Sequence, residues 1–106
     1  MTTKERWERL LGLLQELGVE PRLTERKFWG GTYHRPVEKI GYEITIRTPD
    51  GLIEIGDRMW NKNPDVWVGY TAWLSDREGI VKKDMRWTKS RAEVVEWVKN
   101  TMGATV

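Results

Sequence analysis

The chain of 106 residues contains no cysteine and a single histidine, His34. Without cysteine it has no disulfide, no thiol nucleophile and no thiolate zinc site, and one histidine excludes a cluster of histidine ligands. The sequence has no phosphate-loop, dinucleotide-binding or calcium-loop motif, and no serine or threonine in a nucleophile-elbow pattern. We therefore expect no metal and no other cofactor, and we predict a protein that is not an enzyme.

Long hydrophobic runs are also missing. No apolar stretch approaches the roughly 20 residues of a membrane-spanning helix, and the first residues, "MTTKERWERLLGLLQELG", interleave charges with leucines, unlike a secretory signal peptide. Hydrophobic residues make up 39% of the chain and charged residues 32%, a balance typical of folded soluble domains. We expect one cytoplasmic domain, residues 1–106, that does not bind membranes.

Each end of the chain has the apolar spacing of an amphipathic helix. Thr2 and Glu5 have the spacing of a capping box before a helix over residues 3–17, and Gly18 is suited to ending it. Ser90 and Glu93 repeat the capping pattern near the other end. The apolar stripes at intervals of three and four residues predict core-facing sides; they consist of Trp7, Leu10, Leu11, Leu14 and Leu17 in the first helix, and Val94, Val95, Trp97, Val98 and Met102 in the second.

Between the helices the apolar residues alternate with a period of two, which indicates strands. The predicted strands are "GYEITIR", "LIEI", "VWVGYTAWL" and "IVKKDMRW", and the turn "TPDG" between the first two places Gly51 where a positive φ is expected. The sequence thus predicts an α+β fold: an N-terminal helix, a four-stranded antiparallel meander and a C-terminal helix, with both helices on one sheet face. An added short hairpin near residues 26–35 is an alternative.

Alternation also predicts which side chains face away from the helices. Over residues 66–74 the even positions form the better core face, so Trp67 and Trp73 project from the other face. In the last strand Val81, Met85 and Trp87 are expected inward. Trp and Arg are enriched at interface hot spots, and indole faces attract cations. We therefore predict a partner-binding outer face consisting of Arg47, Trp67, Thr71, Trp73, Lys82 and Arg86. The alternatives are that the chain itself covers these indoles, or that the facing is inverted.

Residues 20–39 lie between the expected regular elements and are both basic and aromatic; they form either a loop or hairpin that binds a partner, or an extra hairpin that extends or flanks the sheet. The glycine pair at positions 30–31 is suited to closing a two-residue hairpin. A loop of this length is usually functional, and it would form a positive patch if it lay near the basic last strand. Its candidate binding residues are Arg26, Lys27, Phe28, Trp29, Tyr33, His34 and Arg35.

The function favoured by these patterns is a non-catalytic interaction module that docks onto another protein or onto a second copy of itself. Binding of nucleic acid through the basic aromatic loop, Lys82 and Arg86 is the first alternative. A small enzyme in which His34 acts with Asp57 or Glu38 is the second. In composition, as a short, Trp-rich domain, the chain resembles accessory proteins encoded by bacteriophages and mobile elements. This resemblance covers no residue pattern and implies no site.

Overall fold

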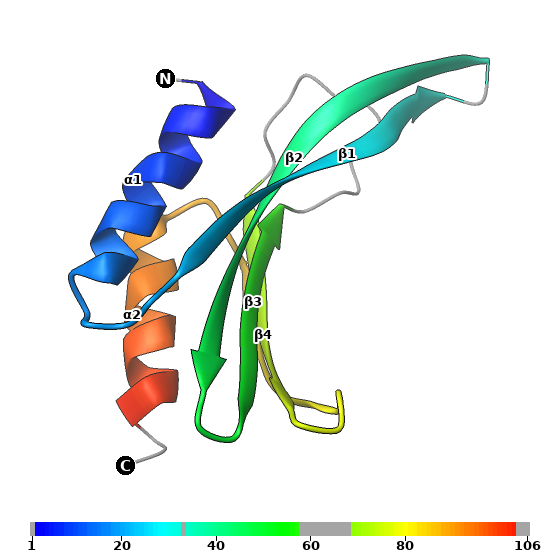
Figure 1. The fold of residues 1–106 in the computed structure, drawn as a ribbon. Coiled ribbons are helices and arrows are strands. Elements are labelled where there is room, and N and C mark those ends of the chain that lie inside the picture. Colours follow the sequence, from blue (N-terminus) through cyan, green and yellow to red (C-terminus); the bar gives the residue numbers. More distant parts are fainter. Residues whose placement is uncertain (1, 33, 58–68, 104–106) are drawn as a thin grey trace.

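The computed structural model describes residues 2–32, 34–57 and 69–103. Within these residues two helices enclose a run of five strands along the sequence (Figure 1). This confirms the α+β class and the helix at each end, whereas the prediction of four strands is wrong. The elements are α1 Thr3–Gln15, β1 Arg22–Thr32, β2 Arg35–Thr48, β3 Gly51–Asp57, β4 Tyr70–Asp76, β5 Val81–Thr88 and α2 Arg91–Gly103.

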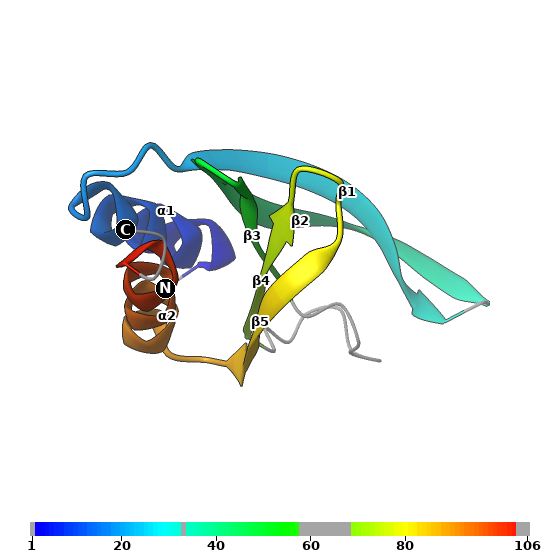
Figure 2. The same ribbon diagram turned by 90° about the horizontal axis from the view of Figure 1, so that it is seen from below.

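Each strand pairs in antiparallel fashion with the next one along the chain, so the sheet order is β1-β2-β3-β4-β5. Both helices lie on one face of this sheet, and no helix of the described chain covers the other face (Figure 2). This arrangement agrees with the predicted layers. We call the face that points away from the helices the outer face.

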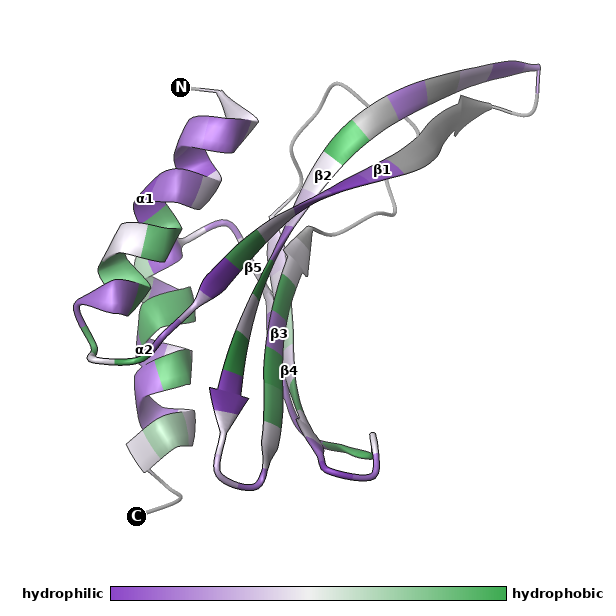
Figure 3. Ribbon diagram, viewed as in Figure 1, coloured by the Kyte–Doolittle hydropathy of each residue, from purple (hydrophilic) through white to green (hydrophobic). Residues whose placement is uncertain are grey.

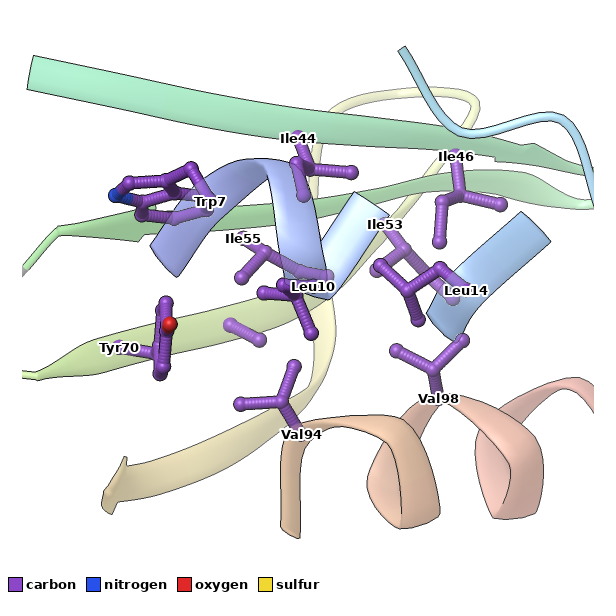
Figure 4. Close-up of a cluster of buried hydrophobic side chains, with 11 residues drawn as sticks. Trp7, Leu10, Leu14, Ile44, Ile46, Ile53, Ile55, Tyr70, Val94 and Val98 are labelled. Carbon is purple, nitrogen blue, oxygen red and sulfur yellow. The ribbon is translucent and has the colours of Figure 1, made fainter. Parts of the chain in front are cut away.

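The core lies between the helices and the inner sheet face (Figure 4). In the centre, the Trp7 and Tyr70 rings meet edge to face, with 5.0 Å between their centroids. Hydrophobic and hydrophilic bands alternate along β2 and β3 (Figure 3), as a strand with one buried face requires. The fully buried apolar residues are Trp7, Leu10, Leu14, Ile44, Ile46, Ile53, Ile55, Tyr70, Ala72, Val94 and Val98; both predicted helix stripes are therefore core faces.

The helix caps follow the sequence signals. The Thr2 side chain accepts a hydrogen bond from the Glu5 backbone N–H at 3.1 Å, and the Ser90 hydroxyl accepts one from the Glu93 backbone N–H at 3.3 Å. Each cap satisfies an N–H that has no partner within its helix. Helix α1 ends at Gln15, two residues before the predicted end, and the turn that follows reaches the left-handed Gly18 at φ 82°.

The alternative of an added hairpin near residues 26–35 agrees with the structure, but the hairpin is longer than expected and is formed by the whole of β1 and β2. Their pairing runs without a break from Arg22 opposite Thr45 to Thr32 opposite Arg35. The chain therefore reverses after Thr32, and the glycine pair at positions 30–31 lies inside a strand. The alternation is hard to recognise because Leu23 is the only apolar residue among the first six positions of β1.

The outer part of this hairpin extends beyond the rest of the sheet (Figure 1). Strand β2 pairs with β3 only over residues 43–48, so residues 25–32 and 35–42 form a two-stranded ribbon, which we call the arm. The Cα radius of gyration is 14.4 Å, compared with about 13 Å for a compact chain of similar length. The arm accounts for this elongated shape.

Predictions about three single residues fail for reasons of backbone geometry. Gly51 does not have a positive φ; instead, a Cβ at this position would overlap the Ser75 carbonyl oxygen in the neighbouring β4 backbone. Strand β5 has two register irregularities against β4. As a result Val81 pairs with Ser75 of the outer face and is 55% exposed, while Trp87 lies against Gly69 and is 38% exposed. Neither belongs to the core.

Candidate binding surface

The outer face is built from alternate residues of the central strands. Tyr70 and Ala72 of β4 are buried in the core. The residues that alternate with them, Thr71 and Trp73, therefore point to the opposite side. This confirms the predicted facing of the described part of β4. Trp67 lies outside the described residues.

Trp73 lies at the centre of a row that crosses the sheet. Its direct cross-strand neighbours are Glu54 of β3 and Asp84 of β5, and Glu54 is in turn opposite Thr45 of β2. Side chains directly opposite each other on one face have Cβ atoms about 5 Å apart. The indole is therefore flanked by two carboxylates, whereas the sequence suggested Trp73 beside arginine and lysine.

An open pocket of about 740 Å³ borders Trp73 towards the β2–β3 and β4–β5 turns. Its sides combine apolar and charged groups from β2, β3, β4 and β5. Trp73 itself is half-buried, so part of the indole remains available to a second molecule. The strand residues that line the pocket are Arg47, Thr48, Gly51, Leu52, Glu54, Trp73, Ser75, Asp76 and Val81.

Two arginines line the turn end of this pocket. The Arg77 guanidinium donates a hydrogen bond to the Pro49 carbonyl oxygen at 2.8 Å, which holds the two turns together. Arg47 is exposed and forms no ion pair with any part of the chain that the structure describes. A second pocket, of about 610 Å³, shares Arg47 and Leu52 with the first and reaches Arg22 at the start of β1. The second pocket is also lined by Gly18, Val19, Glu20 and by Met102 of α2, so only its strand residues belong to the outer face.

Glu43 and Glu54 form an acidic pair on the same face. Burial, and then a hydrogen bond with Glu54, raise the pKa of Glu43 above its usual value of 4.5, while the charge of Arg26 opposes this rise. The Arg26 Nε lies 3.0 Å from a Glu43 carboxylate oxygen. One of the two acids thus has a cation of its own, and Glu54 has none among the described residues.

The structure brings together only some of the residues predicted for the outer face. Arg47, Thr71 and Trp73 lie on it. Lys82 instead turns towards Asp76, with 3.5 Å between the charged atoms, and Arg86 is exposed on the edge strand β5. Lys82 is therefore engaged at the β4–β5 turn and is not part of the predicted set beside Trp73. At this turn Asp76 also accepts hydrogen bonds from the backbone N–H groups of Glu78 and Ile80.

The basic residues expected in a loop are part of the arm and its base. Arg26 pairs with Glu43, and Lys27 pairs with Glu38 at 3.6 Å. His34 and Arg35 are exposed at the reversal of the hairpin. Tyr33 and the side chains of Phe28 and Trp29 lie outside what the structure describes. Since β1 and β5 are opposite edges of the sheet, the arm does not lie beside the last strand. The two therefore do not form the positive patch that a loop near the last strand would form.

The described residues provide no pairing of His34 with Asp57. The end of β3 lies opposite Glu43 of β2, nine positions from His34, or about 30 Å at roughly 3.4 Å per residue. Glu38, the other suggested partner, pairs with Lys27. In the part of the chain that the structure describes, no three His, Asp or Glu side chains lie close enough to hold a metal ion.

Some surface residues were missed by the sequence interpretation. Leu52, Arg77 and Val81 line the pocket, and Asp84 flanks Trp73. The alternation of β3 and β5 places Glu54 and Asp84 outward, so the acidic neighbours of Trp73 could have been proposed. The positions of Arg77 and Val81 depend on the turn and on the register irregularity, which no local sequence signal reveals.

No family model, no curated protein and no solved structure matches this chain. Neither helix in the described residues is long and apolar enough to cross a membrane.

Proposed function

We propose that this protein is a non-catalytic interaction module that docks a protein partner on its outer sheet face. The observation that supports this most is the half-buried Trp73 at the border of an open pocket, on the sheet face that no described helix covers. A partly exposed indole has a large apolar area and few rotatable bonds, which favours a role as an interface anchor. Leu52 and the exposed Val81 add apolar surface beside it.

A protein partner suits this face better than nucleic acid does. Phosphate groups require free cations, yet three of the predicted phosphate-binding residues already pair with acids: Arg26 with Glu43, Lys27 with Glu38 and Lys82 with Asp76. Carboxylates on both sides of Trp73 would also repel a phosphate backbone. Apolar surface with charges of both signs around it is the pattern of protein interfaces.

Site-specific photo-cross-linking in the cells that produce the protein tests this proposal. A benzoylphenylalanine at Val81, beside the pocket, is expected to form a defined protein adduct that survives nuclease treatment. The same group at Glu96, which is exposed on α2, is the matched control and should not form it. An adduct that disappears with nuclease would instead favour nucleic acid.

A second variant separates docking from folding. Trp73 lies outside the core, so Trp73→Ala should retain the far-ultraviolet circular dichroism of the wild type while losing the Val81 adduct. Trp73→Phe, which keeps an aromatic ring, should retain part of it. Unchanged cross-linking in Trp73→Ala would refute a docking role for this face.

A further inference from the structure

We infer that the outer face recognises a positively charged side chain of its partner, an arginine held on Trp73 between Glu54 and Asp84. This inference rests on the proposed docking function and names the chemistry of the segment that docks. Its basis is the register of the sheet, which places one acidic residue directly opposite Trp73 on each neighbouring strand.

These two acidic residues differ from three other acids of the sheet. Glu38, Glu43 and Asp76 each have a cation of the chain within ion-pair distance. Glu54 and Asp84 have none among the described residues: Arg47, one row away on the same face, does not reach Glu54. The hydrogen bond between Glu54 and Glu43 joins two acids and supplies no positive charge. The site beside the indole therefore has negative charge to be neutralised from outside.

An arginine side chain fits this arrangement in both shape and charge. A guanidinium is planar, stacks on aromatic faces and is weakly hydrated, so it binds an indole more readily than an ammonium group does. Its several N–H groups can also donate to carboxylates on both sides. The remaining neighbours of Trp73 along β4 are Thr71 and Ser75, which carry no charge.

A second copy of this chain fits the site less well. Arg47 and Arg77 lie at the turn end of the same pocket, so a segment that places arginine on Trp73 needs an apolar or acidic residue next to it. The exposed arginine of β5, Arg86, lies instead in a basic segment that has Lys82, Lys83 and Lys89 with a single acid, Asp84, so in a second copy it would bring further positive charge to Arg47 and Arg77. The partner is therefore a separate protein, and its docking segment combines an arginine with an acidic or apolar neighbour.

Nuclear magnetic resonance can test this chemistry without knowledge of the partner. The probe is N-acetyl-arginine methylamide, and the matched control is N-acetyl-citrulline methylamide, which has almost the same shape and no charge. The arginine probe is expected to shift the indole Nε1–H signal of Trp73, assigned from its loss in Trp73→Phe. The signal of Trp87, whose indole lies against Gly69, serves as the internal control and should stay in place.

Charge removal provides the second arm of the test. In the double variant Glu54→Gln and Asp84→Asn, which keeps the side-chain sizes, the arginine-induced shift of Trp73 should fall at least about threefold, because neutral amides do not attract the cation. Glu96→Gln on α2 should leave it unchanged. Equal shifts from the arginine and citrulline probes, or no shift from either, would overturn the inference.

These results are distinguishable from those of the cross-linking experiment. If arginine fails to move the Trp73 signal while Trp73→Ala still abolishes the Val81 adduct, the face docks a protein by other chemistry and only the inference is wrong. Loss of the adduct in Trp73→Ala together with a concentration-dependent dimer of the wild type in sedimentation, absent in the variant, would assign the face to self-association and would also overturn the inference.

Discussion

Gly51 allows a quantitative test of how β3 and β4 approach each other. A Cβ at this position would overlap the Ser75 carbonyl oxygen and lie close to the Asp76 Cα. Both obstacles belong to the backbone of β4, which cannot rotate away as a side chain can. In Gly51→Ala the two strands must therefore separate at their first two pairs, Gly51 with Asp76 and Leu52 with Ser75.

The size of the effect follows from these pairs. A backbone hydrogen bond contributes about 1 kcal/mol net, so weakening about two of them costs about 2 kcal/mol. Alanine also restricts the unfolded chain, which returns about 0.4–1 kcal/mol. We expect Gly51→Ala to lower the free energy of unfolding by about 1–2 kcal/mol, and to lower Tm by about 5–15 °C in a domain of this size.

Gly56 in the same strand is the matched control, because a Cβ there would meet no atom within 4 Å. Gly56→Ala should leave stability unchanged or raise it by about 0.4–1 kcal/mol. Urea unfolding followed by circular dichroism measures both variants. If Gly51→Ala were as stable as Gly56→Ala, the close approach of β4 to Gly51 would be refuted.

Three further predictions concern the core, a cap and the pH dependence. Leu10→Ala should lower the free energy of unfolding by about 2–5 kcal/mol in urea titrations, because Leu10 is fully buried; a loss below 1 kcal/mol would contradict its central position. Ser90→Ala should cost about 1 kcal/mol by removing the acceptor of the Glu93 N–H, whereas Ser90→Asp, which keeps an acceptor, should not. Because the pKa of Glu43 is raised above 4.5 in the folded protein, its protonated form adds stability at low pH that is lost as pH rises through the folded pKa. Glu43→Gln should therefore show a smaller fall in Tm from about pH 4 to about pH 7 than the wild type, and parallel Tm profiles would count against the raised pKa.

The sequence predicts those elements whose apolar residues are regularly spaced. The stripe of Trp7, Leu10 and Leu14 and the alternation of Tyr70 and Ala72 are core faces in the structure, since periodic burial leaves a periodic pattern. Strand β1 was predicted only as part of an alternative hairpin near residues 26–35. Much of β1 extends past the core, where charged pairs such as Lys27 with Glu38 replace the alternation of apolar residues. Its stability comes from pairing with β2, a contact that a local window does not contain.

The candidate site was predictable only in outline. The outward facing of Trp73 followed from alternation within one strand. Its flanking by Glu54 and Asp84 required the register of β3 and β5, and the exposure of Val81 required the irregularity opposite Leu74 and Ser75. Cross-strand register is set by the turns and by the packing of the whole sheet. The sign of the charge beside the Trp73 indole therefore does not follow from the sequence of β4 alone.

The placement of α1 and α2 on one face has a consequence for how the chain folds. Every strand pairs with its neighbour in sequence, so each hairpin can form through local contacts, which favours rapid folding. The contact between α1 and α2 is different, because it joins the two ends of the described chain. During synthesis the inner sheet face and α1 can therefore meet early, but Val94 and Val98 complete the core only once α2 has been made. Until then the partly formed domain exposes the apolar surface that α2 later covers.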